Sequence, residues 1–156
     1  MARLLFNAED RREIWGGITI MPMKEETIIC ILKDEISEKD IRLEDILTYE
    51  PGQKYIGYVA SATVKKEYAT HFRELLRSVF DFACSRYPDI QITKLYAYAS
   101  SPEGWDLMKR LFFTPRRDIN RNAFELDLFE RNPSPYLKPF QDCLKSKGAT
   151  IFEPEW

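Results

Sequence analysis

The sequence predicts an α/β or α+β domain built on a mixed sheet. The stretch from Lys54 to Val64 is largely small or apolar at alternate positions, which is typical of a strand buried on both faces. The stretch from Ala69 to Tyr87 repeats apolar residues at helical spacing. From Ile90 to Ala99 the sequence returns to strand-like alternation. This strand–helix–strand order, with further elements on either side, is the basis of the prediction.

The first elements form a predicted β-hairpin. Arg3 to Asn7 and Glu13 to Met21 are predicted strands, and the polar residues between them form the turn. The pair Gly16-Gly17 indicates a bulge or a close backbone approach. We expect Pro22 to end the second strand.

The segment from Lys24 to Gln53 is predicted to be a helical excursion. Lys24 to Ile36 has helical spacing, although Thr27 to Leu32 is also rich in β-favouring residues, so a strand is the alternative. Ser37 to Gln53 is polar and is expected to hold a short second helix or to be partly ordered. The dipeptide Pro51-Gly52 closes it as a turn.

The predicted central strand has two faces. One face comprises Ile56, Tyr58, Ala60, Ala62 and Val64. The other comprises Gly57, Val59, Ser61 and Thr63.

The second half of the chain predicts two further helices and a strand. Ser101 can cap a helix that has Pro102 at its first position, where a missing N–H costs nothing. Its predicted apolar face comprises Trp105, Met108, Leu111 and Phe112. A strand is predicted from Ala123 to Phe129. A last helix is predicted from Tyr136 to Ser146, ending at Gly148.

The composition narrows the class of protein. The 156 residues, 44% hydrophobic and 31% charged, fit one globular domain. The net charge of −2 gives no electrostatic footprint for nucleic acid, and no apolar run approaches the roughly 20 residues that cross a bilayer. The N-terminus becomes charged too soon for a signal peptide. We therefore expect a cytoplasmic protein without nucleic-acid or membrane partners.

The cysteines and the single histidine exclude some kinds of site. Cys30, Cys84 and Cys143 are odd in number and contain no CxxC pair, so neither a zinc site nor a dithiol motif is indicated. We interpret all three as reduced thiols. His71 is the only histidine, which excludes a multi-histidine metal centre.

Between Lys54 and Leu128 the order of elements and the residues resemble the GNAT superfamily of acyl-CoA-dependent N-acetyltransferases. The stretches that carry the resemblance are Tyr55 to Val64, Glu67-Tyr68 with the following helix, Leu95 to Ala99, Ser101-Pro102 and Leu107 to Phe113. Trp15 to Pro22 resembles an earlier hairpin strand of the family. The resemblance implies a mostly antiparallel sheet flanked by helices, and an acetyl-CoA or another acyl-CoA as co-substrate.

The resemblance also implies which residues would bind the coenzyme, mainly through backbone groups. The pantetheine and thioester contacts fall on Ser61, Ala62, Thr63 and Val64. The pyrophosphate loop falls on Tyr68, Ala69, Thr70, His71, Phe72 and Arg73. The family's asparagine at the start of the next helix falls on Ser101. Core packing is the alternative for Ala62 and Val64.

Several positions depart from the family pattern. The loop from Tyr68 to Arg73 contains no glycine, although glycine lets a backbone approach phosphate closely. Met108 stands where the family has a tyrosine that acts as general acid, and methionine cannot donate a proton. Phe112-Phe113 replaces a Gly-Phe pair. The family's N-terminal strand and helices are expected to be reduced or absent, with Lys24 to Gln53 as a candidate cover for that face.

Two residues are candidates for catalysis. Glu67 could act as general base for an amine, directly or through water. Tyr98, or Tyr96, could replace the missing acid. The structural alternatives are a solvated carboxylate for Glu67 and core packing for the tyrosines. His71 could contact phosphate or act as a base, or it could be a surface residue at a helix start.

The leading functional hypothesis is transfer of an acetyl or other acyl group from coenzyme A to the amine of a small molecule or protein. The second is a catalytically degenerate module that senses acyl-CoA or binds a protein, with a homodimer or partner chain covering the shortened N-terminal side. An unrelated α/β interaction protein is the third. A basic cluster is a candidate for the adenosine 3′-phosphate, for an acidic partner, or for solvent alone; it comprises Lys109, Arg110, Arg116, Arg117 and Arg121.

The chain is predicted to be one domain over residues 1–156. Its predicted parts are the hairpin (1–23), the helical insertion (24–53), the acyl-CoA-type core (54–129) and the C-terminal helix with its tail (130–156).

Overall fold

A six-stranded sheet with the order β1-β2-β3-β4-β6-β5 forms the centre of the computed structural model, which describes residues 1–155. The strands are β1 (Ala2–Phe6), β2 (Ile14–Met23), β3 (Gln53–Val64), β4 (Ile90–Tyr98), β5 (Thr114–Pro115) and β6 (Ala123–Asp127). Neighbours are antiparallel except β3 and β4, which are parallel. The prediction of a mixed, mostly antiparallel sheet is confirmed.

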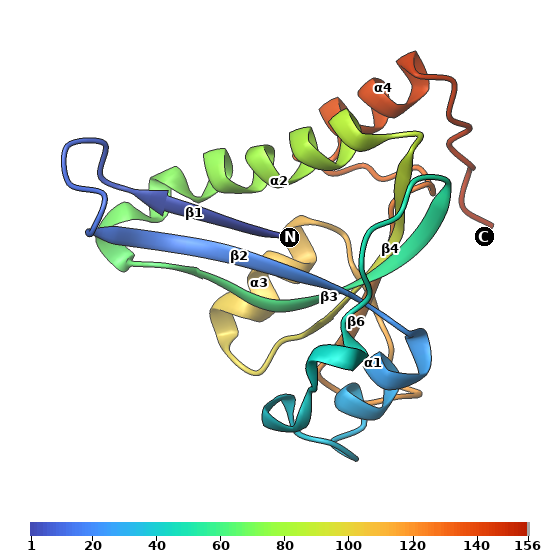
Figure 1. Cartoon of the computed structure of the whole chain (residues 1–156), viewed down its shortest axis with the longest axis horizontal. Coiled ribbons are helices and arrows are strands. Elements are labelled where there is room, and N and C mark those ends of the chain that lie inside the picture. Colours follow the sequence, from blue (N-terminus) through green and yellow to red (C-terminus); the bar gives the residue numbers. More distant parts are fainter. Residues whose placement is uncertain (156) are drawn as a thin grey trace.

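Helices cover both faces of this sheet. They are α1 (Glu25–Leu32), α2 (Phe72–Arg86), α3 (Pro102–Arg110) and α4 (Lys138–Ser146), with 3₁₀ turns η1 (Glu38–Asp40), η2 (Leu43–Asp45) and η3 (Lys66–His71). In Figure 1, α2 and α4 lie together above the sheet and α1 lies below it. The core therefore has two parts, one on each face of the sheet. On one face, called here the helix face, the sheet packs against α2, α3 and α4. On the other, called here the α1 face, it packs against α1 around Tyr58 and Tyr96.

The predicted hairpin is confirmed, but the prediction that Pro22 ends its second strand is wrong. Strand β2 continues to Met23, and Pro22 pairs with Gly57. The carbonyl of Pro22 accepts from the N–H of Leu47, so it points away from β3. A backbone N–H at position 22 would point to the same side, where β1 no longer pairs with β2. Proline therefore costs no hydrogen bond of the sheet.

The segment after the hairpin is helical, so the strand alternative for Thr27 to Leu32 is wrong. Helix α1 stops before the predicted Ile36, and Asp34 takes a left-handed conformation with φ of 60° just beyond it. The predicted short second helix is replaced by the turns η1 and η2. An isolated bridge between Met23 and Ile46 holds this excursion against the sheet.

The predicted faces of β3 are wrong beyond Ala60. Ser61 pairs with Thr19 and Val59 pairs with Ile20, so Ala60 is an extra residue and forms a β-bulge. Ala60 packs on the α1 face with Ile56 and Tyr58, whereas Ala62 packs with Val59 on the helix face. The bulge adds one residue to the alternation, so Ala62 and Val64 change sides relative to the prediction, as do Ser61 and Thr63.

Three helix boundaries differ from the prediction. Helix α2 begins at Phe72 instead of Ala69 because the preceding residues form η3. Phe112 does not belong to the apolar face of α3: it is 52% exposed with φ of 55°, and Phe113 is buried in its place. Helix α4 begins at Lys138, and Gly148 lies beyond its end with φ of 90°.

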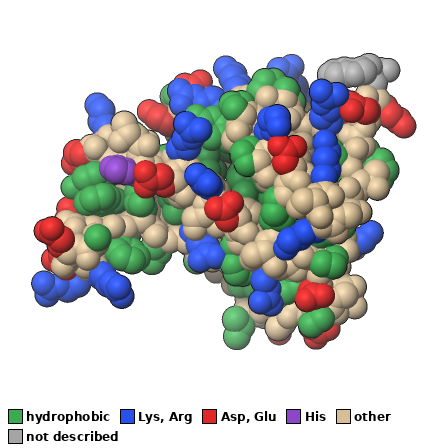
Figure 2. Space-filling model, turned by 90° about the horizontal axis from the view of Figure 1, so that it is seen from above, with side chains coloured by type: hydrophobic (Ala, Val, Ile, Leu, Met, Phe, Trp, Pro, Cys, Tyr) green, Lys and Arg blue, Asp and Glu red, His purple; other side chains and the backbone are tan. Residues whose placement is uncertain are grey.

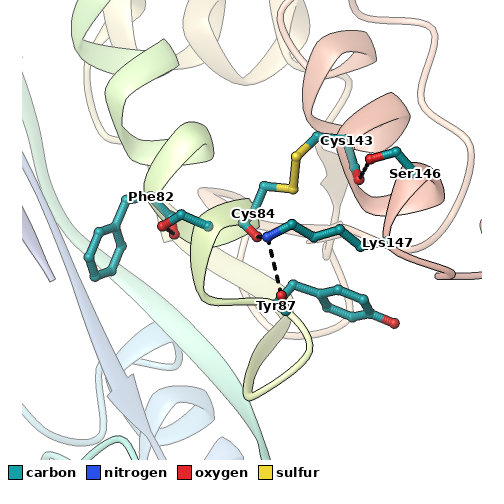
Figure 3. The surroundings of a disulfide bond; sticks show 7 residues. Phe82, Cys84, Tyr87, Cys143, Ser146 and Lys147 are labelled. Atoms are coloured by element: carbon teal, nitrogen blue, oxygen red, sulfur yellow. Dashed lines mark hydrogen bonds between the residues drawn. A yellow bond between two sulfur atoms is a disulfide. The ribbon is translucent and has the colours of Figure 1, made fainter.

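The prediction of three reduced thiols is wrong for two of them. Cys84 on α2 and Cys143 on α4 form a disulfide, shown in Figure 3. The Nζ of Lys147 donates to the carbonyl of Cys84 at 2.6 Å, so the same two helices are also joined by a hydrogen bond. Their sequence separation of 59 residues gave no local spacing signal. Cys30 is a free cysteine.

Candidate functional site

Strands β3 and β4 separate before β3 ends. They pair from Gln53 with Ile90 as far as Val59 with Ala97, and the described ladder stops there. Beyond the bulge, β3 still pairs with β2, with Ala62 opposite Ile18 and Val64 opposite Gly16. One edge of Ala60–Val64 therefore has no strand beside it, and its backbone groups are available to an extended ligand.

A cavity of about 660 Å³ lies beside this open edge. Its volume is within the range of small-molecule sites. Its lining residues come from β3 (Ala62, Thr63, Val64), from η3 and the start of α2 (Lys66, Ala69, Phe72), and from α3 with its cap (Ser101, Glu103, Gly104, Asp106, Leu107, Arg110). Six residues from the predicted coenzyme set, all but Ser61, Tyr68, Thr70, His71 and Arg73, are thus brought together around one space.

The start of α3 is fixed as the sequence predicted. The N–H of Gly104 donates to the Ser101 hydroxyl at 3.0 Å, and Pro102 occupies the first helical turn. Met108, where the family pattern has its general acid, is 5% exposed and packs in the core of the helix face. Met108 lines neither this cavity nor a smaller one that adjoins it, so the described site contains no general acid from α3 at that position.

The turn η3 is held against the sheet by aromatic packing. The rings of Trp15 and Tyr68 stack with centroids 3.9 Å apart, and the hydroxyl of Tyr68 donates to Glu13 at 3.2 Å. The side-chain amide of Asn7 is the main cause of a lowered pKa of Glu13, which keeps that carboxylate charged. The N–H of Lys65 also donates to the carbonyl of Trp15 at 2.7 Å. The loop position is therefore fixed by the start of β2.

Part of the predicted pyrophosphate loop already uses its own amides. The N–H of Tyr68 donates to the carbonyl of Lys65 at 2.9 Å, and the N–H of Phe72 donates to that of Ala69. These two amides are not available to an anion. His71 lines neither the first cavity nor the smaller one that adjoins it. Its Nδ1 lies 3.5 Å from Glu74, and its ring lies against Trp15. Ser61 also lines neither.

A second cavity of about 290 Å³ adjoins the first between α2, α3 and Tyr136. Its lining residues are Ala69, Thr70, Phe72, Arg73, Leu76, Leu107, Arg110 and Tyr136. Four of these residues, Ala69, Phe72, Leu107 and Arg110, border both cavities.

Sequence reasoning named only Ser101 and Arg110 from the wall that α3 and its cap contribute, and it missed Tyr136. Leu107 is apolar but does not belong to the apolar face predicted for α3. An apolar residue outside the predicted core face was the available signal that it lines a cavity. Tyr136 could not have been found, because it reaches the site only through tertiary packing.

The two catalytic candidates lie apart from these cavities. Glu67 is exposed on η3 and lines neither. Tyr98 packs on the α1 face, where its hydroxyl accepts from Asn122 at 3.4 Å. The described contacts do not join Glu67 to Tyr98, and their roles stay predictions.

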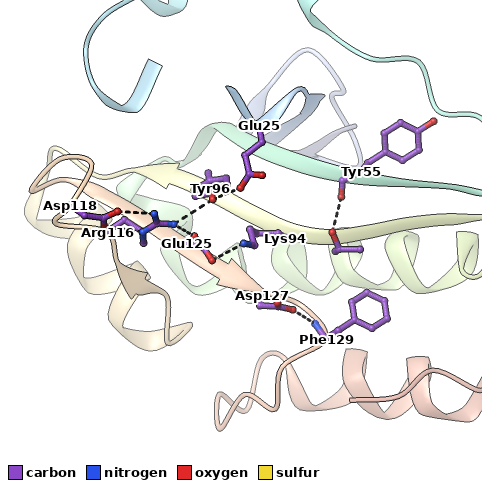
Figure 4. A network of polar contacts seen from close by, with 10 residues as sticks. Glu25, Tyr55, Lys94, Tyr96, Arg116, Asp118, Glu125, Asp127 and Phe129 are labelled. Carbon is purple, nitrogen blue, oxygen red and sulfur yellow. Dashed lines mark hydrogen bonds and ion pairs between the residues drawn. The ribbon is translucent and has the colours of Figure 1, made fainter. Parts of the chain in front are cut away.

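A polar network on the α1 face connects α1 with β4 and β6 (Figure 4). The hydroxyl of Tyr96 donates to Glu25 at 2.7 Å, and Lys94 pairs with Glu125 at 2.9 Å. Arg116 pairs with both Glu125 and Asp118. Burial alone would raise the pKa of Glu125, but bonds from Lys94 and Arg116 lower it, so the carboxylate stays charged. Burial raises the pKa of Tyr96, which keeps its proton.

Among residues 1–155, no group of three or more His, Cys, Asp and Glu side chains is arranged to hold a metal ion. No described helix is both long and apolar enough to cross a membrane.

Comparison with known proteins identifies the fold. No protein-family model matches the sequence, and no curated protein matches it. Among solved structures, a mutant AtaT toxin bound to the C-terminus of the antitoxin AtaR and acetyl-CoA is similar, with a TM-score of 0.51 and 14% identity. The match covers 86% of this chain and 68% of that one. The chain has a GNAT-like fold.

At this identity the likeness shows the fold alone. The GNAT-like fold confirms the predicted resemblance, and the separation of β3 and β4 differs from the full-length pairing that the third hypothesis, an α/β interaction protein with a coincidental order of elements, requires. A second structure, Arabidopsis thaliana NAA60 in complex with a bisubstrate analogue, is similar at a TM-score of 0.37 and 17% identity, over 74% of this chain and 62% of that one. This likeness adds no argument about the fold.

Proposed function

We propose that this chain is an acyltransferase of the N-acetyltransferase type, which moves an acetyl or other acyl group from coenzyme A to an amine. The observation that carries the proposal is the open edge of Ala60–Val64 beside a cavity of about 660 Å³. The first solved structure reported above, AtaT, contains acetyl-CoA, which supports the same ligand class here.

The residues at this edge fit the coenzyme's pantetheine arm. The arm carries amide groups, which can pair with the unpartnered backbone of Ser61–Val64 as an added strand would. The apolar side chains of Phe72 and Leu107 line the space beside it, and so does Ser101. When bound, the coenzyme would supply an acyl thioester: a C–N bond forms as the C–S bond breaks, the amine loses a proton and the departing sulfur gains one.

Glu67 and Tyr98 keep their proposed roles in these proton transfers. Glu67, exposed on η3, would take the amine proton through water. Tyr98, at the end of β4, would protonate the departing sulfur from the α1 face. A carboxylate such as Glu67 can accept a proton from the attacking amine, and a phenol such as Tyr98 can donate one to the departing thiolate.

Ligand-induced stabilisation tests the proposal. Acetyl-CoA at about one hundred times its Kd should stabilise the native state by about 2.7 kcal/mol and raise Tm by several degrees. Ala62→Trp, which places a large ring on the side of β3 that faces α2 and α3, should abolish the shift. Gln53→Trp, on an exposed position at the other end of β3, should leave it intact. Unchanged melting of the parent protein at millimolar acetyl-CoA would contradict coenzyme binding.

A second candidate, a catalytically degenerate module, is favoured by the buried Met108 and by the internally bonded amides of Tyr68 and Phe72. Such a module would sense an acyl-CoA or bind a protein. It predicts coenzyme binding without thiol release in the presence of a panel of small amines and amine-bearing peptides. Steady thiol release with any of these acceptors would exclude it.

We also propose a homodimer or a partner chain on the hairpin. Leu4, Phe6 and Ile14 there are exposed apolar side chains, which favours a surface covered by another chain.

The cytoplasm remains our proposed location, as part of the single-domain acyltransferase hypothesis. The Cys84–Cys143 disulfide is of a kind that reducing compartments disfavour. Light scattering would measure the oligomeric state, and subcellular fractionation would measure the location.

A further inference from the structure

We propose that Trp15, in the hairpin, is a positioning residue for the candidate site, because its ring fixes the turn η3 that forms one wall of the first cavity. The inference rests on the proposed function. It gives a role to a residue that lies outside the predicted site and lines neither cavity. Trp15 acts through η3 and makes no contact with the ligand itself.

The turn η3 and the residue after it present two faces. A 3₁₀ helix has about three residues per turn, so side chains three positions apart lie on the same face. The residues with this spacing that line the first cavity are Lys66, Ala69 and Phe72. Tyr68 and His71 have the same spacing on another face, and both rings lie against Trp15. A shift of η3 relative to Trp15 would therefore move the cavity wall.

The ring of Trp15 contacts η3 at a kink and again beyond it. Tyr68 departs from helical geometry, with φ of −113° and ψ of 17°. Its ring stacks on Trp15 with centroids 3.9 Å apart and planes inclined by 11°. The ring centroid of His71 lies 5.7 Å from that of Trp15. Figure 2 shows this histidine, the only one in the chain and coloured purple, at the surface beside apolar and acidic side chains.

The sequence of the turn does not itself impose the kink. No residue from Lys65 to His71 is a glycine or a proline, the residues that most strongly dictate a turn. The hydrogen bonds made by the N–H groups of Tyr68 and Phe72 stay within the segment, so they shape the turn without placing it on the sheet. Among the described residues, its hydrogen bonds and ring contacts to the hairpin all end on Glu13 or Trp15.

A β-bulge accounts for the orientation of Trp15. Leu5 of β1 pairs with Gly16 of β2, and the next residue, Phe6, pairs with Ile14. Trp15 is therefore an extra residue of β2 with no partner on β1. Bulges re-aim a side chain and are frequent beside active sites.

The end of β3 holds this bulge in place. The N–H of Lys65 donates to the carbonyl of Trp15 at 2.7 Å. Gly16 pairs with Val64, and a Cβ at position 16 would lie 2.6 Å from the carbonyl oxygen of Thr63, so the close approach requires glycine. Thr63 and Val64 both line the first cavity. Trp15 is thus placed against the open edge of β3 and η3 together.

Titration with acetyl-CoA tests the inference. Trp15→Leu keeps an apolar side chain but removes the ring, and it should weaken acetyl-CoA binding by about tenfold, the upper end of what one aromatic pair contributes. Trp15→Phe restores a ring and should bind within about threefold of the parent. Hydrogen exchange at the amides of Tyr68 and Phe72 should be faster in Trp15→Leu and should return toward the parent's rate in Trp15→Phe.

Tyr49→Leu is the matched control. It removes one ring of the edge-on pair formed by Tyr49 and Tyr55, whose centroids lie 4.9 Å apart at the other end of β3. It should lower Tm as Trp15→Leu does, yet bind acetyl-CoA within about twofold of the parent, since the two sites are far apart. A role of Trp15 in stability alone would not separate the two variants in this way.

The outcomes separate the inference from the proposed function. Equal acetyl-CoA affinity in Trp15→Leu and Tyr49→Leu would overturn the inference and leave the proposed function standing. If Trp15→Leu does not fold, Tyr68→Leu removes the other ring of the stack and takes its place, with the same expected result. A parent protein that does not bind acetyl-CoA would overturn the proposed function. Exchange at the two amides needs no ligand and would then decide the inference, which unchanged exchange in Trp15→Leu would overturn.

Discussion

Phe112 shows how one residue can depart from a family pattern and keep the local structure. The N–H of Phe113 donates to the carbonyl of Met108 at 3.0 Å, and the N–H of Phe112 donates to that of Lys109 at 3.1 Å. These bonds make the usual C-terminal cap of a helix, in which a left-handed residue, most often glycine, follows the last turn. Here phenylalanine occupies that place with φ of 55°.

A comparison of Phe112→Gly with Phe112→Ala measures the strain at this position. Both variants lose the same exposed ring, but only glycine avoids the clash of a Cβ in the left-handed region, which costs about 1 kcal/mol or more. We expect the glycine variant to exceed the alanine variant by about 1 kcal/mol in free energy of unfolding, measured with urea. Equal stabilities would mean that φ is not positive in solution.

At the scale of elements, the sequence predicted what depends on local patterns. The periodicity of Phe72 to Arg86 is a property of one helix, and the cap at Ser101 depends on the residues beside it, so both could be predicted. The bulge at Ala60 could not, because it is defined by pairing with Thr19 and Ile20, about forty residues away. Of the site residues predicted on β3, Ala62, Thr63 and Val64 line the first cavity and Ser61 does not, whereas Leu107 and Tyr136 line the cavities without having been predicted.

The ion network between β4 and β6 predicts how stability changes in acid. The pKa of Glu125 is lowered in the folded state, so its stabilisation is present above the unfolded value of about 4.3 and is lost as the pH falls through the folded pKa. Glu125→Gln should reduce the slope of stability with pH below about pH 5, measured by urea unfolding.

The slope should not vanish, because Glu13, Asp118 and Asp142 also have lowered pKa values. Glu130→Gln, which removes an exposed carboxylate from the chain after β6, serves as the control and should keep the parent's slope. A parental slope in Glu125→Gln would show that the network does not hold this carboxylate.

On the scale of the whole molecule, the disulfide links the first and the last of the three helices on the helix face. The start of α2 lines both cavities, α4 is the last described helix, and the pairing of Cys84 with Cys143 joins the two helices. A crosslink between distant residues stabilises mainly by restricting the unfolded chain. The helix that carries the site is thereby tied to the end of the fold.

Thiol titration and unfolding test this crosslink together. Denatured protein should show one reactive thiol, Cys30, before reduction and three afterwards. Reduction should lower the free energy of unfolding by about 4 kcal/mol for a loop of this length. Cys30→Ser is the control: it should show no reactive thiol before reduction and respond to reductant as the parent does. Three thiols in the untreated protein would refute the disulfide.

The bulge at Ala60 makes the open edge depend on the length of β3 more than on its side chains. Because Ala60 is the extra residue, deleting it would leave Val59 opposite Ile20 and Ser61 opposite Thr19, with every other side chain on its present face. The deletion would nevertheless remove the bend that accompanies a bulge. Position 60 should therefore tolerate substitution by other small residues far better than loss of a single residue.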